Sequence, residues 1–221
     1  MKSLYPNIDW NSIKMVGFDL DGTLYEEFDF IYQVYDNISK LISKYVGENS
    51  DFVLDYLLEV WMSKGSSYNK IFDDFLSLYN FEKDQKEKII IECLSIFRNF
   101  VPSLKLSYKV NFLLKNFSRK YELFLVTDGR EKLQKNKIKS LGIDKFIKNK
   151  NIIISSKYKN IKTKIDLNMI EKLTDLKSYL SCEVVFFGDR KIDLDFSKRN
   201  GFNFIPVSLM EYNPKIELKN D

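Results

Sequence analysis

Histidine is absent from this 221-residue chain. Without an imidazole the chain cannot build a Ser-His-Asp or Cys-His arrangement, and it cannot hold zinc through histidine. The side chains that remain for catalysis are carboxylates, lysine, tyrosine and hydroxyl groups, with a hard metal ion as a further option. The absence therefore favours a mechanism built on acids and lysines.

Cysteine and long apolar runs are also scarce. The two cysteines, Cys93 and Cys182, lie far apart in apolar stretches, which favours buried, reduced thiols over a disulfide or a redox pair. The N-terminal segment lacks the apolar stretch of a signal peptide, and no stretch approaches the length of a membrane span. We therefore expect a cytoplasmic protein without a membrane partner.

Charge of one sign is in small excess. The formal net charge is +4, while 44% of the residues are hydrophobic. This balance is typical of a globular protein with a core, and the positive excess would assist the approach of an anionic substrate. No basic run is interleaved with stacking aromatics, so we expect no nucleic-acid partner.

Five short apolar runs predict buried strands. The first covers Met15 to Phe18, and the others lie within YELFLVTDG, NIIISS, EVVFFGD and FNFIPV. Helical patterns separate the later runs, in REKLQKNKIKSLG, IDLNMIEKLTDLKSYL and DLDFSKRNG. Alternation of strands and helices predicts an α/β fold, a Rossmann-like parallel sheet with helices on both faces.

A long helical stretch separates the first strand from the second. From residue 25 to residue 104 apolar residues recur at helical spacing, over a length too great for a crossover helix and with too regular a period for a loop. We expect a helical cap domain over 25–104, inserted into a core domain of 1–24 and 105–221. The aromatic residues Phe28, Phe30, Tyr32 and Tyr35 are expected to pack in its core and hinge.

Acidic residues follow the first strand in FDLDGTL. Ligands bind at the carboxyl ends of strands in an open parallel sheet. A turn that starts at Asp19 would aim the carboxylates of Asp19 and Asp21 at one point, and Gly22 would permit the bend. One carboxylate is then a candidate nucleophile toward phosphorus, and the other a candidate proton donor and acceptor.

Three further features follow later strands. Thr127 ends LFLVT and precedes Asp128, Gly129 and a helix, where a hydroxyl and exposed N–H groups suit phosphate oxygens. A lysine in KTKIDLNMI would neutralise a phosphoryl group. Asp189 and Asp193 follow the strand in EVVFFGD, and clustered carboxylates without nitrogen or sulfur partners suit Mg²⁺.

Each feature also has a simpler explanation when it is taken alone. Asp19 and Asp21 could belong to a solvated turn, Asp189 and Asp193 could stabilise a helix N-terminus, and Thr127 could cap a helix. The presence of all of them in one order favours the chemical interpretation.

The order of these motifs resembles a known family. DLDGTL, a strand-end Thr, a Lys and GDxxxD resemble the four motifs of the haloacid dehalogenase superfamily, from about Ile13 to Val207. The helical insert after the first motif resembles the type 1 cap of subfamily I. That group includes phosphoglycolate phosphatases, beta-phosphoglucomutases, nucleotidases and sugar-phosphate phosphatases.

The resemblance implies a role for each motif residue. Asp19 would be the nucleophile and a ligand of Mg²⁺, and Asp21 would be the general acid/base and bind the metal through its backbone carbonyl. Thr127 would hold a phosphoryl oxygen. Asp189 would bind Mg²⁺, and Asp193 would support that site directly or through water.

The lysine of the third motif is the least defined of these residues. The family often shows KPDPxIF, and KIDLNMI fits it at Lys164 and Asp166, although both prolines are missing. We assign Lys164, and Lys162, Lys159 and Lys157 remain alternatives.

Five residues are assigned to substrate binding. Gly22, Asp128 and Gly129 belong to the loops of the first two motifs, Lys64 lies in the break WMSKGSSYNK of the helical insert, and Tyr25 directly follows the nucleophile loop. Many relatives carry Asn where this chain has Asp128, so a negative charge is added beside the expected phosphate site.

These assignments together predict an enzyme. We expect Mg²⁺-dependent hydrolysis of a small phosphorylated metabolite, a phosphate monoester, through an aspartyl-phosphate, by a monomer or homodimer. A phosphomutase that uses the same residues is the first alternative. A non-catalytic binding protein on the same fold is the second, and the intact pair Asp19 and Asp21 disfavours it.

Overall fold

The computed structural model describes residues 5–158, 161, 163–167 and 179–207. The chain forms two compact units. The sheet unit comprises Met1–Glu26, Leu106–Asp128 and Ile143–Asp221, and the helical unit comprises Glu27–Lys105 and Gly129–Gly142. The segment 129–142, which the sequence assigned to the core domain, thus groups with the helices. We describe the two units separately.

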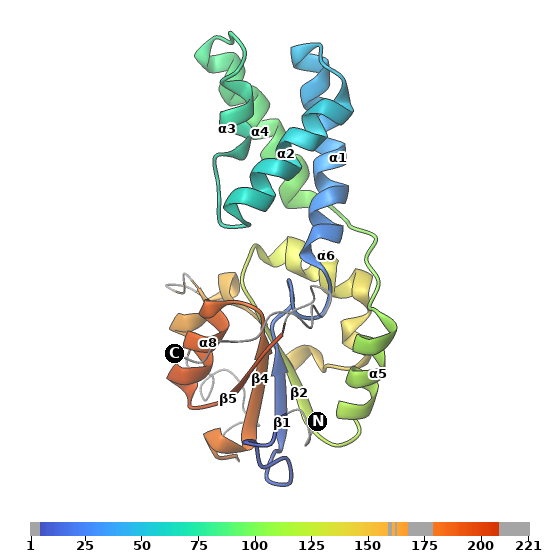
Figure 1. The fold of residues 1–221 in the computed structure, drawn as a ribbon, viewed down its shortest axis with the longest axis vertical. Coiled ribbons are helices and arrows are strands. Elements are labelled where there is room, and N and C mark those ends of the chain that lie inside the picture. Colours follow the sequence, from blue (N-terminus) through green and yellow to red (C-terminus); the bar gives the residue numbers. More distant parts are fainter. Residues whose placement is uncertain (1–4, 159–160, 162, 168–178, 208–221) are drawn as a thin grey trace, which may run out of the picture. The chain divides into compact units, whose positions relative to one another are not determined.

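The sheet unit contains five parallel strands in the order β3-β2-β1-β4-β5 (Figure 1). The strands are β1 Met15–Phe18, β2 Glu122–Thr127, β3 Ile152–Ile154, β4 Val184–Gly188 and β5 Asn203–Pro206. Its helices are α5 Tyr108–Phe117 and α8 Lys191–Asn200, and the short 3₁₀ turns are η1 Ile143–Lys145, η2 Asn149–Asn151, η3 Ser155–Lys157, η4 Lys164–Asp166 and η6 Ser181–Glu183. The predicted Rossmann-like α/β fold is confirmed.

Continuous apolar runs explain why the central strands lie inside. Every residue of β1 and β4 is buried, as expected of parallel strands covered on both faces. On one face Phe196 of α8 packs edge-on against Phe186, with ring centroids 4.9 Å apart. On the other face Phe117 of α5 stacks with Phe18 at 6.3 Å. The helices therefore cover both faces of the sheet, as Figure 1 shows.

The helical unit is built from α1 Glu27–Val46, α2 Ser50–Lys64, α3 Ile71–Leu76, α4 Lys83–Asn99 and α6 Glu131–Leu141. The apolar stripe of α1 is buried as its spacing predicts. The α6 residue Lys137 is itself buried, and its ammonium lies 3.9 Å from the centroid of the Phe30 ring. A cation over an aromatic face is attractive, and more so when desolvated, so this contact helps attach α6 to α1.

The expectation for the four aromatic residues after the first motif is half wrong. Phe30 and Tyr35 are buried, whereas Phe28 is 38% and Tyr32 47% exposed. The exposed pair lines an open pocket of about 440 Å³ in the helical unit, together with Asp29, Gln33, Ser103, Leu104 and Lys105. Their positions fall on the edge of the apolar stripe of α1, where helical spacing alone does not separate core from rim.

The prediction of buried, reduced cysteines is correct for Cys93, while Cys182 is reduced but not buried. Both are free thiols, with Cys93 buried and Cys182 exposed. Cys182 lies in η6, the turn before β4, rather than in the strand. The helix predicted in IDLNMIEKLTDLKSYL falls largely on 168–178, outside the described residues. Among the described helices, none combines the length and apolar character that a membrane crossing requires.

Gly17 provides a test of the packing in the sheet. A Cβ added at this position would overlap the ring of Phe124. We predict that Gly17→Ala lowers the free energy of unfolding by about 1–3 kcal/mol, the usual cost of overpacking a core. In a Phe124→Leu background the same substitution should cost much less. Equal losses in both backgrounds, measured by denaturant unfolding, would contradict this account.

Candidate active site

The candidate site lies at the carboxyl edge of the three central strands. The chain passes from β1 through β2 to β3 on one side, and then crosses to β4 and β5 on the other. A parallel sheet whose strand order reverses in this way has a crevice where the connections part. Asp19 follows β1, Asp128 follows β2, and Asp189 follows β4.

The loop after β1 turns sharply behind Asp19. The Asp19 N–H donates to the Phe187 carbonyl at 2.9 Å, which continues the strand pairing by one residue. The bend then comes at Gly22, whose φ of +77° is strained for a residue with a side chain. A Cβ at Gly22 would also overlap the Asp189 carboxylate. Gly22 therefore serves both the turn and the close approach of two motif loops.

Lys164 joins two of the acids inside the sheet unit. Its ammonium donates to Asp19 Oδ1, and to Asp193 Oδ1 at 2.8 Å. The side chains of Lys164 and Asp193 have no exposed surface, and that of Asp19 is 1% exposed. A buried charge is costly unless it is paired, so each of the three groups depends on the others.

The ionisation of this cluster reflects burial opposed by pairing. Burial raises the pKa of Asp19 to about 7; the positive charge of Lys164 lowers it, and the negative charges of Asp193 and Asp21 raise it. For Lys164, burial alone would lower the pKa, but Asp19 and Asp193 outweigh burial and the net pKa is raised. Lys164 therefore stays cationic, and Asp19 gains its proton far more readily than an exposed carboxylate.

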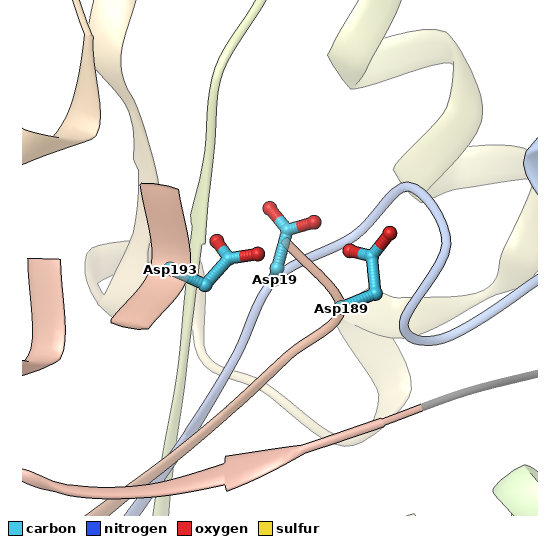
Figure 2. A group of neighbouring side chains, drawn as sticks. All are labelled: Asp19, Asp189 and Asp193. Atoms are coloured by element: carbon cyan, nitrogen blue, oxygen red, sulfur yellow. The ribbon is translucent and has the colours of Figure 1, made fainter. Parts of the chain in front are cut away.

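Three carboxylates form a group that could hold a metal ion. Oxygens of Asp19, Asp189 and Asp193 lie within 4.8 Å of one another, and Figure 2 shows Asp19 between the other two. Asp19 Oδ2 is buried and has no hydrogen-bond partner among the described residues. Carboxylate oxygens are the ligands that Mg²⁺ prefers, and three acids around one ammonium leave excess negative charge. The residues present therefore fit a hard divalent cation.

The two acids after β4 differ in their surroundings. Asp193 Oδ2 accepts the Arg190 N–H at 3.0 Å while Oδ1 accepts from Lys164, so both oxygens are engaged. Asp189 is exposed, and Thr23 Oγ1 donates to its Oδ1 at 3.3 Å. Desolvation by neighbouring atoms nevertheless raises the pKa of Asp189. Asp189 is thus the more available ligand, and Asp193 supports Lys164 and the start of α8.

Thr23 is a site residue that the sequence reasoning missed. It is buried, and its hydroxyl orients the Asp189 carboxylate. The only signal was its place in DLDGTL, where it reads as the end of a turn. Its hydrogen-bond acceptor lies 166 residues away in the sequence, so the local pattern could not predict this contact.

Among the four candidate lysines, Lys164 contacts Asp19. Its N–H donates to Asp128 Oδ1 at 2.7 Å, and in the turn that carries it Asp166 Oδ2 accepts the N–H of Thr163 at 3.3 Å. Lys157 lies exposed in η3, and Lys159 and Lys162 lie outside the described residues. The carboxylate of Asp128 thus has a hydrogen-bond donor in the main chain of Lys164.

Thr127 ends β2 with a side chain that is 1% exposed. Its hydroxyl donates to the Asp128 carbonyl at 3.3 Å. The helix α6 begins only at Glu131 with Arg130 as its N-cap, so Thr127 is not a helix cap. Gly129 follows with a φ of +123°. The roles of Thr127 and Gly129 toward phosphate stay predictions.

Asp21 and Tyr25 are joined within the first loop. Asp21 is 7% and Tyr25 3% exposed, and the Tyr25 hydroxyl donates to Asp21 Oδ1. Tyr25 also accepts the Gly22 N–H through its carbonyl, at 3.1 Å. Lys64, by contrast, belongs to the helical unit, where its ammonium lies 4.4 Å from the centre of the Tyr68 ring. Its role toward a substrate stays a prediction.

The contact between Asp128 and Lys164 leads to a stability prediction. Asp128→Ala leaves the Lys164 N–H without its acceptor, which should lower the free energy of unfolding by about 1–3 kcal/mol. Asp128→Asn keeps an acceptor oxygen and should lose less than half as much. Equal losses for the two variants, in urea unfolding followed by circular dichroism, would show that the acceptor is unimportant.

Comparison with known proteins identifies relatives of this arrangement. A family profile described as haloacid dehalogenase-like hydrolase matches residues 16–207. A search among curated proteins gives no match, while 174 chains of solved structures match.

Three of these structures illustrate the likeness. A HAD-superfamily hydrolase of subfamily IA, variant 1, from Geobacter sulfurreducens PCA has a TM-score of 0.66 at 16% identity, over 88% of this chain and 87% of that one. A candidate beta-phosphoglucomutase from Thermotoga maritima has a TM-score of 0.63 at 18% identity, over 92% of this chain and 89% of that one. The candidate HAD-hydrolase YfnB from Bacillus subtilis, described as bound to magnesium, has a TM-score of 0.63 at 15% identity. The match covers 93% of this chain and 89% of that one.

Identities this low carry the fold alone, but the profile spans most of the chain. Its match runs from β1 to the residue after β5 and so includes every acid described above. The chain belongs to the haloacid dehalogenase-like hydrolase family.

Proposed function

We propose that this protein hydrolyses a small phosphate monoester, with Asp19 as the nucleophile and Mg²⁺ as the cofactor. One observation carries the proposal: a buried carboxylate at the end of the central strand is contacted by a buried ammonium and flanked by further acids. A carboxylate held in this way suits attack on phosphorus, and the chain has no histidine to serve instead.

Mg²⁺ would be held by Asp19 and Asp189, with the Asp21 main-chain carbonyl as a third ligand implied by the family. The uncommitted oxygen of Asp19 and the exposed carboxylate of Asp189 support this assignment. When bound, the cation supplies positive charge that offsets the repulsion between the acids and a phosphate dianion. That one relative is described as bound to magnesium agrees with the choice of metal.

In the first step an oxygen of Asp19 bonds to phosphorus as the bond from phosphorus to the ester oxygen breaks. Asp21 gives its proton to the departing oxygen, so the product leaves as a neutral alcohol. Lys164 beside Asp19 offsets the negative charge that gathers in the transition state. The hydroxyl of Thr127 and the N–H groups that follow it bind the phosphoryl oxygens.

In the second step the ionised Asp21 takes a proton from water. The water oxygen bonds to phosphorus and the bond from phosphorus to Asp19 breaks, which releases phosphate and restores both carboxyl groups to their starting states. Asp21 is held by the Tyr25 hydroxyl, and a general base must lie within hydrogen-bond reach of the water that it deprotonates. The substrate is proposed to be a small phosphorylated metabolite.

A phosphomutase is the second candidate, and one observation favours it. A candidate beta-phosphoglucomutase is among the structures that share this fold. In that reaction the phosphoryl group on Asp19 would pass to a sugar hydroxyl instead of water. Product analysis separates the two: free phosphate indicates a phosphatase, and an isomerised sugar phosphate indicates a mutase.

The reaction class is tested by phosphate release. We expect release from at least one member of a panel of sugar phosphates, nucleotides and p-nitrophenyl phosphate, with Mg²⁺ present and not with chelator. Asp19→Asn should reduce turnover by at least about 10³-fold, because the nucleophile is lost. Asp55→Asn, at an exposed position of α2, is the matched control. Near-normal turnover of Asp19→Asn would exclude Asp19 as the nucleophile.

The affinity for Mg²⁺ should depend on pH. The pKa of Asp19 in the metal-free protein is raised to about 7 by burial, so below that pH the cation must displace a proton. Affinity should therefore rise with pH, by up to about tenfold per unit, and level off above pH 7. Calorimetry in buffers of different ionisation enthalpy should detect proton release at pH 6. Constant affinity from pH 5.5 to 8 would contradict this prediction.

A further inference from the structure

Tyr25 closes the nucleophile loop onto Asp21 in two ways. Its hydroxyl donates to Asp21 Oδ1, and its carbonyl accepts the N–H of Gly22. Asp21 and Tyr25 also form an isolated parallel β-bridge. The tyrosine therefore fixes both the main chain and the carboxyl group of the loop that carries the proposed acid/base.

The burial of Tyr25 argues against direct contact between its side chain and a substrate. The whole residue is 3% exposed, and its hydroxyl points to a carboxylate rather than to solvent. The phenol hydroxyl is its one polar side-chain group, and that group is engaged by Asp21. Tyr25, which the sequence assigned to substrate binding, is thus placed to act through another residue.

Asp21 needs such support because it lies close enough to Asp19 for the two negative charges to repel. The two acids are two residues apart in the sequence, and the negative charge of Asp21 raises the pKa of Asp19. Loss of the hydrogen bond from Tyr25 would remove one restraint that opposes this repulsion. Proton transfer requires hydrogen-bond reach to the ester oxygen, and a displacement of about 1 Å can cost about 10²-fold in rate.

We propose that Tyr25 is a positioning residue whose hydroxyl holds Asp21 in place for proton transfer to and from the substrate. The proposal rests on the proposed function, because it assigns the proton transfer to Asp21. It adds a residue that the motif pattern does not require, and the contact of its hydroxyl is with the carboxyl group of Asp21 rather than with the nucleophile or with the main-chain carbonyl proposed as a metal ligand.

The consequence is a dependence on the leaving group. An alkoxide is a poor leaving group and needs a proton from Asp21, whereas p-nitrophenolate departs without one. Since kcat/KM covers the steps up to release of the leaving group, loss of a positioned acid should appear there for alkyl phosphates only. A purely structural role for Tyr25 would lower kcat/KM for both substrates alike.

The test compares Tyr25→Phe with the unaltered protein on the best alkyl phosphate of the panel and on p-nitrophenyl phosphate. We expect kcat/KM to fall about tenfold for the alkyl ester, a part of the 10²–10⁴-fold that general acid catalysis supplies, and to change less than about twofold for the aryl ester. Mg²⁺ affinity should not change. Tyr108→Phe, at a position 97% exposed, is the control.

Two further variants complete the test. In an Asp21→Asn background, Tyr25→Phe should have no additional effect on the alkyl ester, since the residue acts through Asp21. Tyr25→Leu also lacks the hydroxyl and should show the same substrate pattern, on top of any loss of stability from the cavity that it leaves. Equal losses on both esters, or no loss on either, would overturn the proposal. Absence of Mg²⁺-dependent release from the unaltered protein would instead overturn the proposed function.

Discussion

The contact of Lys164 with Asp19 and Asp193 is the interaction on which the site depends. All three side chains are buried, and replacing water around three charges costs free energy that good geometry must offset. In proteins, apolar residues of similar volume are often at least as stable as a buried ion cluster. Stability alone therefore does not explain the ion cluster. It holds the Asp19 carboxylate, with a pKa of about 7, in a buried position beside the cationic Lys164.

Much of the surrounding structure places these charges. Asp128 binds the main chain of Lys164, and Asp166 accepts the N–H of Thr163 in the same turn. Asp193 holds the Lys164 ammonium with one oxygen and the N-cap of α8 with the other. The parallel sheet brings these segments together, because the ends of β1, β2 and β4 meet at one edge. Helix capping and charge pairing thus use the same side chain.

The sequence predicted the elements well where the signal was local. The strands are continuous apolar runs, and the acids stand directly after them, so fold and motif positions followed from pattern. Local patterns could not predict contacts between residues far apart in the sequence. Examples are the hydrogen bond from Thr23 to Asp189 and the one from the Lys164 N–H to Asp128. The choice of Lys164 among four lysines came from a family pattern, since a lysine-rich stretch gives no physical reason to prefer one. Cys182 shows that an apolar neighbourhood does not ensure burial.

The chain passes between its two units four times, and two of these junctions adjoin the acids. One lies between Glu26 and Glu27, one residue after Tyr25, and another lies between Asp128 and Gly129. The remaining two junctions, after Lys105 and after Gly142, lie away from the acids in sequence. The chain therefore leaves the sheet unit close to Asp21 and directly after Asp128, whose carboxylate binds the main chain of Lys164. A change of the main-chain dihedral angles at either junction would act first on a loop that carries one of these two acids.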